Sequence, residues 1–83
     1  MSYYELWIAD KRSMLQTMQR NMSSDLECGY NPNGNCIIRQ KVEIERYAQQ
    51  FDDEQKALRT MSKNQAEHWC KVDLIRRGAI EVF

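Results

Sequence analysis

Residues 37–58, IIRQKVEIERYAQQFDDEQKAL, decide the fold of this chain. Four large apolar residues recur in this stretch at intervals of seven: Ile37, Ile44, Phe51 and Leu58. Such heptad spacing places apolar residues along one side of an α-helix and suits a long helix that packs lengthwise on another. The pattern predicts a helix over about residues 36–61, with Asn35 as its N-cap and Phe51 central in the core.

An earlier amphipathic segment supplies the packing partner for this helix. Ser2 and Glu5 have the spacing of a capping box, which marks a helix start. The apolar residues that follow fall within an arc of about 120° on a helical wheel. They are Tyr4, Trp7, Ile8, Met14, Leu15, Met18 and Met22. A helix over about residues 3–22 is therefore predicted. Lys11 lies in the same arc, and we expect its stem on the apolar surface and its ammonium group in water.

A third, shorter helix is predicted over about residues 63–77. Ser62 and Gln65 form a second capping box, and Gly78 is suited to end the helix in the left-handed conformation. Ala66, Trp69, Cys70 and Leu74 share one face. The fold class is thus all-α: an antiparallel hairpin of helices 3–22 and 36–61, with helix 63–77 packed across it.

The whole chain, residues 1–83, is predicted to form one small domain. Residues 23–35 are rich in turn-forming residues, among them Pro32 and Gly34, and indicate a connector between the two long helices. A connector of this length is unusual between packed helices. It indicates either a binding role or a segment that folds over the core through Leu26 and Tyr30. Residues 79–83 form an apolar C-terminal tail, whose isoleucine, valine and phenylalanine we expect to dock rather than to extend into solvent.

The composition excludes several classes of protein. Twelve Lys and Arg balance twelve Asp and Glu, and no segment concentrates positive charge as a nucleic-acid footprint would. The longest apolar run, residues 6–9, is too short for a membrane span or for the core of a signal peptide. We therefore expect a cytoplasmic protein without a membrane partner.

Three cysteines provide the only recognisable chemistry. Cys28 and Cys36 bracket the connector, but seven intervening residues do not match a zinc knuckle. The pair allows three interpretations: reduced thiols with Cys36 packed at the start of its helix, a disulfide or redox pair, or a metal site with Cys70 as third ligand. His68 and Cys70 diverge on a regular helix, so Cys70 is predicted in the core and His68 on the surface.

Residues 74–82, LIRRGAIEV, resemble the last helix and following strand of winged-helix domains. That resemblance implies a nucleic-acid-binding surface. Winged-helix domains also need a helix-turn-helix and a wing hairpin, and neither is indicated in this sequence. The balanced net charge argues against a nucleic-acid partner, and this function is kept only as an alternative.

No paired carboxylates, metal-ligand set or activated nucleophile stands out, so we predict neither enzymatic activity nor a cofactor. The leading interpretation is a small protein–protein interaction module, an accessory or inhibitory protein that binds a larger partner. A cysteine-based redox or metal site is the first alternative. The partner-binding candidates are Tyr30, Asn31, Asn33, Ile38, Val42, Val72, Ile75, Arg76 and Arg77.

Apolar residues outside the main stripes predict self-association. They comprise Leu6, Ile38, Val42, Val72 and Ile75, followed by the apolar tail. One three-helix interior cannot accommodate all of them, and a symmetric dimer is the commonest way to cover such residues. We therefore expect a homodimer whose interface includes the second long helix or the tail. The alternative is a monomer that keeps this surface for a different partner.

Overall fold

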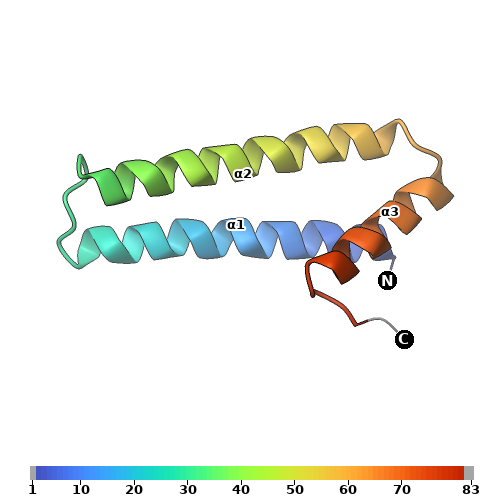
Figure 1. Cartoon of the computed structure of the whole chain (residues 1–83), viewed down its shortest axis with the longest axis horizontal. Helices are drawn as coiled ribbons and strands as arrows, with labels where there is room; N and C mark the ends of the chain where they lie inside the picture. The colour runs from blue at the N-terminus through green and yellow to red at the C-terminus, as the bar shows by residue number, and fades with distance from the viewer. Residues whose placement is uncertain (1, 82–83) are drawn as a thin grey trace.

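The computed structural model describes residues 2–81 as three helices (Figure 1). They are α1 (Tyr3–Glu27), α2 (Asn35–Arg59) and α3 (Lys63–Arg76), and no strand occurs among the residues described. The long helices α1 and α2 run antiparallel and pack along each other, while α3 turns back and packs on α1. This arrangement confirms the predicted hairpin with a third helix across it.

The connector is shorter than the sequence indicated. Residues 23–27 continue α1 as regular helix, so the prediction that α1 ends near residue 22 is wrong. Tertiary contact stabilises the extra turns, because the Gln40 side-chain amide of α2 donates to Asp25 Oδ2 at 2.7 Å. The left-handed Gly29, with φ of 100°, follows shortly after the helix ends.

The helix starts are set largely by serine caps. Ser2 Oγ accepts a hydrogen bond from the Glu5 amide at 3.1 Å, and Ser62 Oγ accepts one from the Gln65 amide at 3.3 Å. Both predicted caps are confirmed. Asn35, in contrast, is the first residue of α2, and Gly34 occupies the N-cap position without a side-chain hydrogen bond.

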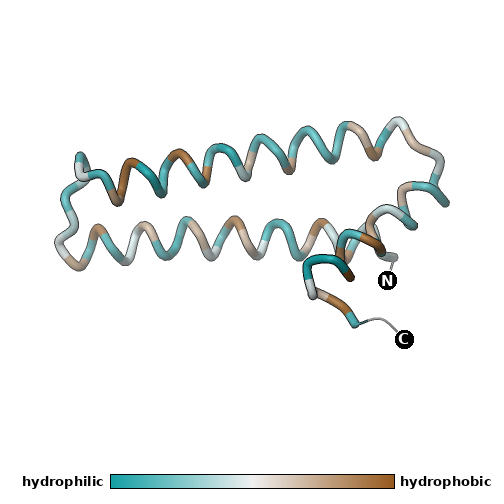
Figure 2. The backbone as a smooth tube through the Cα atoms, viewed as in Figure 1, coloured by the Kyte–Doolittle hydropathy of each residue, from teal (hydrophilic) through white to brown (hydrophobic). Residues whose placement is uncertain are grey.

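The core lies where the three helices meet. Its buried residues are Trp7, Phe51, Leu58, Ala66, Cys70 and Leu74. Figure 2 shows brown, hydrophobic positions on the facing sides of α1 and α2, separated by hydrophilic ones. Every residue of the heptad stripe is buried, although Ile37 and Ile44 lie outside the central cluster. The predicted core positions of Phe51 and Cys70 are thus confirmed.

Three predictions about individual apolar and basic positions are wrong. Lys11 is only 5% exposed, because Glu54 and Tyr47 of α2 lie beside its ammonium group. Met14, expected in the core stripe, is 47% exposed. The third helix covers only the N-terminal part of α1 (Figure 1), so the rest of α1 can bury only the stripe that faces α2. Leu6, expected on an uncovered side face, packs against the core cluster.

Of the described residues of the C-terminal tail, one docks on the core, and Ala79 and Glu81 are exposed. Ile80 is partly buried against the core cluster, and Gly78 has the left-handed φ of 75° that ends α3. Residues 82 and 83, which were also expected to dock, lie outside the described residues.

The third helix covers only part of the hairpin. The described molecule measures 47 × 27 × 18 Å, and α3 lies over the N-terminal part of α1 and the end of α2 (Figure 1). Two helices can bury only the stripe between them, so the half of the hairpin beside the connector retains exposed apolar side chains. Ile38 and Val42, one turn apart on α2, are 47% and 45% exposed.

Candidate functional site

A network of polar side chains attaches α3 to α1. Asp73 Oδ2 accepts hydrogen bonds from Trp7 Nε1 and from Arg77 Nε, both at 2.9 Å. Arg77 also forms an ion pair with Asp10 of α1. Burial alone lowers the pKa of the Arg77 guanidinium, but its hydrogen bonds to Asp10 and Asp73 outweigh this effect and raise the pKa. These charges therefore stabilise one another and form a structural network.

A second polar group is enclosed between α1 and α2. Lys11 Nζ lies 3.8 Å from Glu54 Oε2 and 5.1 Å from the centre of the Tyr47 ring. Burial raises the pKa of Tyr47, and the nearby carboxylates of Asp10 and Glu54 add to this shift. A carboxylate and an aromatic face are both favourable partners for an ammonium group, so burial of Lys11 is compensated.

The carboxylate of Glu67 caps α1 from the outside. Glu67 Oε2 accepts from the Tyr3 amide at 2.9 Å, and Oε1 accepts from the Tyr4 amide at 3.3 Å. These amides belong to the first turn of α1, where helix geometry leaves backbone donors unpaired. Together with Asp73, this contact ties both acidic residues of α3 to α1.

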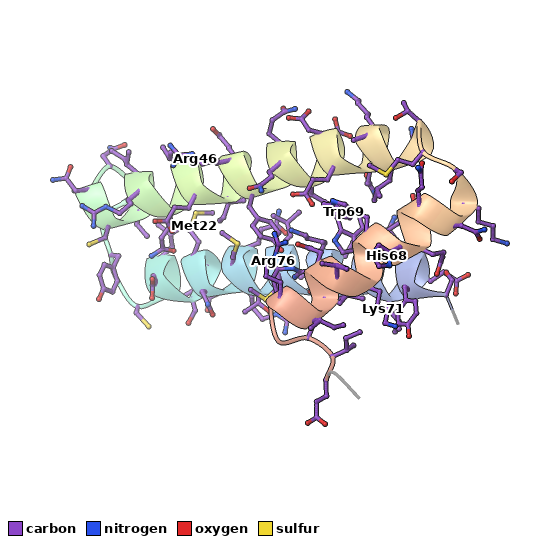
Figure 3. All side chains as sticks on the ribbon, turned by 45° about the vertical axis from the view of Figure 1, so that its right-hand side comes forward. Met22, Arg46, His68, Trp69, Lys71 and Arg76 are labelled. Carbon is purple, nitrogen blue, oxygen red and sulfur yellow. The ribbon has the colours of Figure 1, made fainter. Side chains whose placement is uncertain are left out.

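The outer side of α3 carries a shallow groove with a mostly apolar surface, which we call the α3 groove. It has a volume of about 530 Å³ and is lined by Met61, Asn64, Gln65, His68, Trp69 and Val72. An adjoining recess shares Trp69 and Val72 and adds Asp73 and Arg76. Figure 3 shows Trp69, His68 and Arg76 projecting from α3.

Trp69 connects this groove to the core. Its ring meets the buried Trp7 ring edge-to-face, with centroids 5.5 Å apart and planes inclined at 74°. The contact leaves Trp69 only partly buried, and the remaining surface forms part of the groove floor. Val72, one turn further along, is 38% exposed. A rigid aromatic side chain supported from behind is a typical anchor for a binding surface.

The predicted partner-binding residues fall into two separate groups. Tyr30, Asn31, Asn33, Ile38 and Val42 lie in the connector or at the start of α2, and all are exposed. Within this group the Asn31 side chain accepts from the Asn33 amide at 3.0 Å, which stabilises the turn itself. The remaining candidates lie on or just after α3, at the other end of the molecule (Figure 1).

The second group is divided by its environment. Val72 and Arg76 are accessible, Ile75 is partly buried, and Arg77 is engaged by Asp10 and Asp73. Sequence reasoning missed Met61, Gln65 and Trp69 as surface residues. The sequence did contain a signal for this shared surface, since residues 65, 69, 72 and 76 have the i, i+4, i+7, i+11 spacing of one helical face.

A second groove lies between α1 and α2, beyond the end of α3. Met18, Asn21, Ser24, Asp25, Gln40, Glu43 and Ile44 line its volume of about 420 Å³. Most of these side chains are polar, and Asp25 and Gln40 are paired with each other. This groove offers less apolar surface to a partner than the α3 groove does.

The cysteines occupy two different environments. Cys28 and Cys36 are both free and exposed, so Cys36 is not packed at the start of α2 as one interpretation held. Cys70 is fully buried, and burial raises the pKa of its thiol to about 11, with Glu67 and Asp73 adding to the shift. Among residues 2–81, no three His, Cys, Asp or Glu side chains converge in a way that could hold a metal ion.

None of the three described helices has the length and apolar character needed to cross a membrane. No protein family model, curated protein or solved structure matches this chain. A function can therefore be inferred only from the surfaces of the molecule itself.

Proposed function

We propose that this chain is a non-enzymatic protein–protein interaction module, an accessory or inhibitory protein that binds a larger partner through the α3 groove. The observation that carries the proposal is the apolar floor formed by Met61, Trp69 and Val72 on the outside of α3. Contiguous apolar surface with a polar rim is typical of interaction sites.

The polar side chains that join α3 to α1 support a structural role over a catalytic one. Asp10, Asp73 and Arg77 satisfy one another, and Glu67 is committed to the start of α1. No buried side-chain nitrogen or oxygen among the described residues lacks a hydrogen-bond partner. A catalytic site usually keeps a reactive polar group available for substrate, and these groups are occupied by the fold.

Two matched valines allow a direct test. Val72 on α3 and Val42 on α2 are exposed to similar extents, 38% and 45%, so Val72→Glu and Val42→Glu introduce the same change on two surfaces. Affinity capture from the native host, quantified by mass spectrometry, should lose a specific partner with Val72→Glu and retain it with Val42→Glu. Val72→Glu should keep the parent melting temperature within a few degrees, and Val42→Glu should do so at concentrations where the parent chain is monomeric.

Loss of the partner with Val42→Glu but not with Val72→Glu would place the partner on α2 instead. Capture that is unaffected by Val72→Glu in a folded protein would refute the α3 groove as the binding surface. A measurable hydrolase, transferase or oxidoreductase activity of the purified chain would contradict the non-enzymatic assignment.

We also propose that the chain forms a homodimer, with the α2 face of Ile38 and Val42 as its interface. This face lies at the end of the hairpin where α3 gives no cover. Light scattering over a dilution series should give a dimer mass at tens of micromolar. Val42→Glu should shift the mass to the monomer, whereas a strictly monomeric parent would exclude the dimer.

The exposure of Cys28 and Cys36 favours one alternative function, a thiol-based redox or metal site in the connector. Intact mass under native conditions, with and without reductant, tests it. A mass lower by two hydrogens without reductant, or higher by one metal ion, would support that alternative. Three free thiols and the bare chain mass would remove it.

A further inference from the structure

The polar attachments of α3 are made to α1, the helix farthest from it along the chain. Glu67 accepts from the first amides of α1, Asp73 accepts from Trp7, and the ion pair of Arg77 and Asp10 lies at the end of α3. The partners in these contacts are 63 to 67 residues apart in the sequence. A second copy of the chain carries the same groups, so its α3 can make the same contacts with this α1.

The turn that connects α2 to α3 is short and free of helix-breaking residues (Figure 1). It consists of Thr60, Met61 and Ser62, without glycine or proline. Thr60 has helical dihedral angles, with φ of −86° and ψ of −10°. Ser62 has φ of −63°, the ordinary value for a helix, and departs from the helical path through its ψ of 157°. Residues of these types all adopt helical conformation readily, so α2 and α3 can join into one straight helix.

The apolar pattern of α2 continues through this turn. On a straight helix, Met61 and Val72 fall within about 60° of Leu58, the last residue of the buried heptad stripe. A joined helix over residues 35–76 would therefore keep one continuous apolar side. The sequence pattern is compatible with one long helix as well as with two, and the conformation of the turn decides between them.

We propose that two copies of this chain exchange α3. In the exchanged dimer the turn at residues 60–62 straightens, α2 and α3 join, and α3 of each copy packs on α1 of the other. Each contact between α3 and α1 is formed again between chains, so the closed and exchanged forms differ mainly in the turn and in the entropy of association. The partner is thus a second copy of the chain. This exchange requires neither the α3 groove nor the exposed α2 face of Ile38 and Val42.

The exchange requires α3 to leave its place on α1. Ala66, Cys70 and Leu74 of α3 are buried in the core cluster, so undocking opens the core. A folded closed chain should therefore convert slowly. During refolding, in contrast, α3 meets α1 of its own chain or of another, and protein concentration decides which contact forms first.

Refolding of the Val42→Glu chain at two concentrations tests the exchange, because this substitution blocks the separate dimer proposed for the α2 face. The chain is unfolded in urea and refolded at about 5 μM and at about 500 μM. Size-exclusion chromatography with light scattering then gives the mass. Refolding at the higher concentration should yield a dimer that persists after dilution, and refolding at the lower one a monomer. A monomer from both would overturn the proposal.

Two substitutions at the turn should act in opposite directions in the same background. Lys63 is the first residue of α3, where proline is well tolerated, and proline there favours the extended conformation of Ser62. In the interior of a joined helix the same proline would remove a hydrogen bond and clash with the preceding turn. Lys63→Pro should therefore keep the parent melting temperature within a few degrees and give no dimer on refolding.

Ser62→Ala should favour the exchanged dimer. It removes the side-chain cap of α3, which only the closed form uses, and alanine is a strong helix former. The dissociation constant of the dimer should fall about tenfold, because both copies lose the cap. Equal dimer yields from Lys63→Pro and Ser62→Ala would overturn the straightening of the turn.

A mixed dimer shows which chains supply the contacting helices. Isotope-labelled and unlabelled chains are refolded together at the higher concentration, and isotope-filtered NMR detects contacts between chains only. The Trp7 and Trp69 rings lie 5.5 Å apart in the closed chain, so in the exchanged dimer this contact joins two chains. Contacts between Trp7 of one chain and Trp69 of the other should appear. A dimer without them would be held by another surface and would contradict the exchange.

Discussion

Burial separates one of the three thiols of this chain from the other two. Cys28 and Cys36 are exposed, whereas Cys70 is fully buried and burial raises the pKa of its thiol to about 11. Since the thiolate is the nucleophile, a raised pKa and lack of access both suppress reaction. Under reducing pre-treatment, two cysteines should react rapidly with a thiol reagent at neutral pH, and the third only after denaturant is added. Three rapid thiols would mean that α3 is not stably packed.

The same pKa difference predicts how stability depends on pH. The Cys70 thiol has a higher pKa in the folded chain, about 11, than its ordinary value of 9.0. The unfolded chain therefore loses this proton first as the pH rises, and the contribution of Cys70 to stability is lost between about pH 9 and 11. The loss should reach about 2–3 kcal/mol at the upper end. Burial of Tyr47 raises its pKa and adds a loss in the same direction, which begins near the ordinary tyrosine value of 10.0.

Urea unfolding measured from neutral to alkaline pH checks this dependence. Cys70→Ala should flatten the decline in the free energy of unfolding, and Cys36→Ala, at an exposed thiol, should not change it. An equal decline in the parent and in Cys70→Ala would show that another group causes it.

At the scale of the element, α3 depends on a few polar attachments to α1. The helix has only 14 residues, which is marginal for a helix on its own, so its stability comes from packing and from the contacts of Glu67 and Asp73. The serine cap sets where α3 begins, but these contacts fix where it lies.

Asp73→Asn tests that dependence. The amide oxygen can still accept from Trp7, but it carries no charge to pair with Arg77, whose second partner is Asp10. The free energy of unfolding should fall by about 1–2 kcal/mol. The control is Asp52→Asn, which removes an exposed pair with Lys56 on α2 and should cost only about 0.5 kcal/mol or less. Equal losses in urea unfolding would show that the Asp73 network adds nothing beyond a surface pair.

At the scale of the whole molecule, stability is concentrated at the end where three helices meet. Phe51 lies in that cluster, and its ring approaches the Trp7 ring edge-to-face at 5.5 Å. The hairpin near the connector is held by Ile37, Ile44 and the Asp25–Gln40 hydrogen bond. Hydrogen exchange should therefore be slowest around Trp7 of α1 and Phe51 of α2 and fastest at the connector.

Phe51→Ala should destabilise the chain by about 3–5 kcal/mol, because it opens a cavity in the core where the three helices meet. That loss is a large part of the stability that a domain of this size can have. Ile38→Ala, at an exposed position on the same helix, should change the free energy of unfolding by about 0.5 kcal/mol or less at concentrations where the chain is monomeric. A Phe51→Ala protein that melts within a few degrees of the parent would contradict the packing.

The sequence alone determined the periodic and local features of this protein. The heptad of Ile37, Ile44, Phe51 and Leu58 predicted α2 and its buried stripe, and Ser2 and Ser62 predicted where two helices begin. These features are readable because helix geometry relates residues three, four and seven apart, whatever they pack against.

Only the tertiary structure decided the features that depend on a partner from another helix. Lys11 is buried because Glu54 and Tyr47 of α2 surround its ammonium group, and residues 23–27 stay helical where Gln40 binds Asp25. Trp69 contributes to a surface groove, and Arg77 pairs with Asp10, because α3 crosses α1 at one particular place. The candidate site belongs to this second class, since the exposure of a side chain depends on which neighbours cover it.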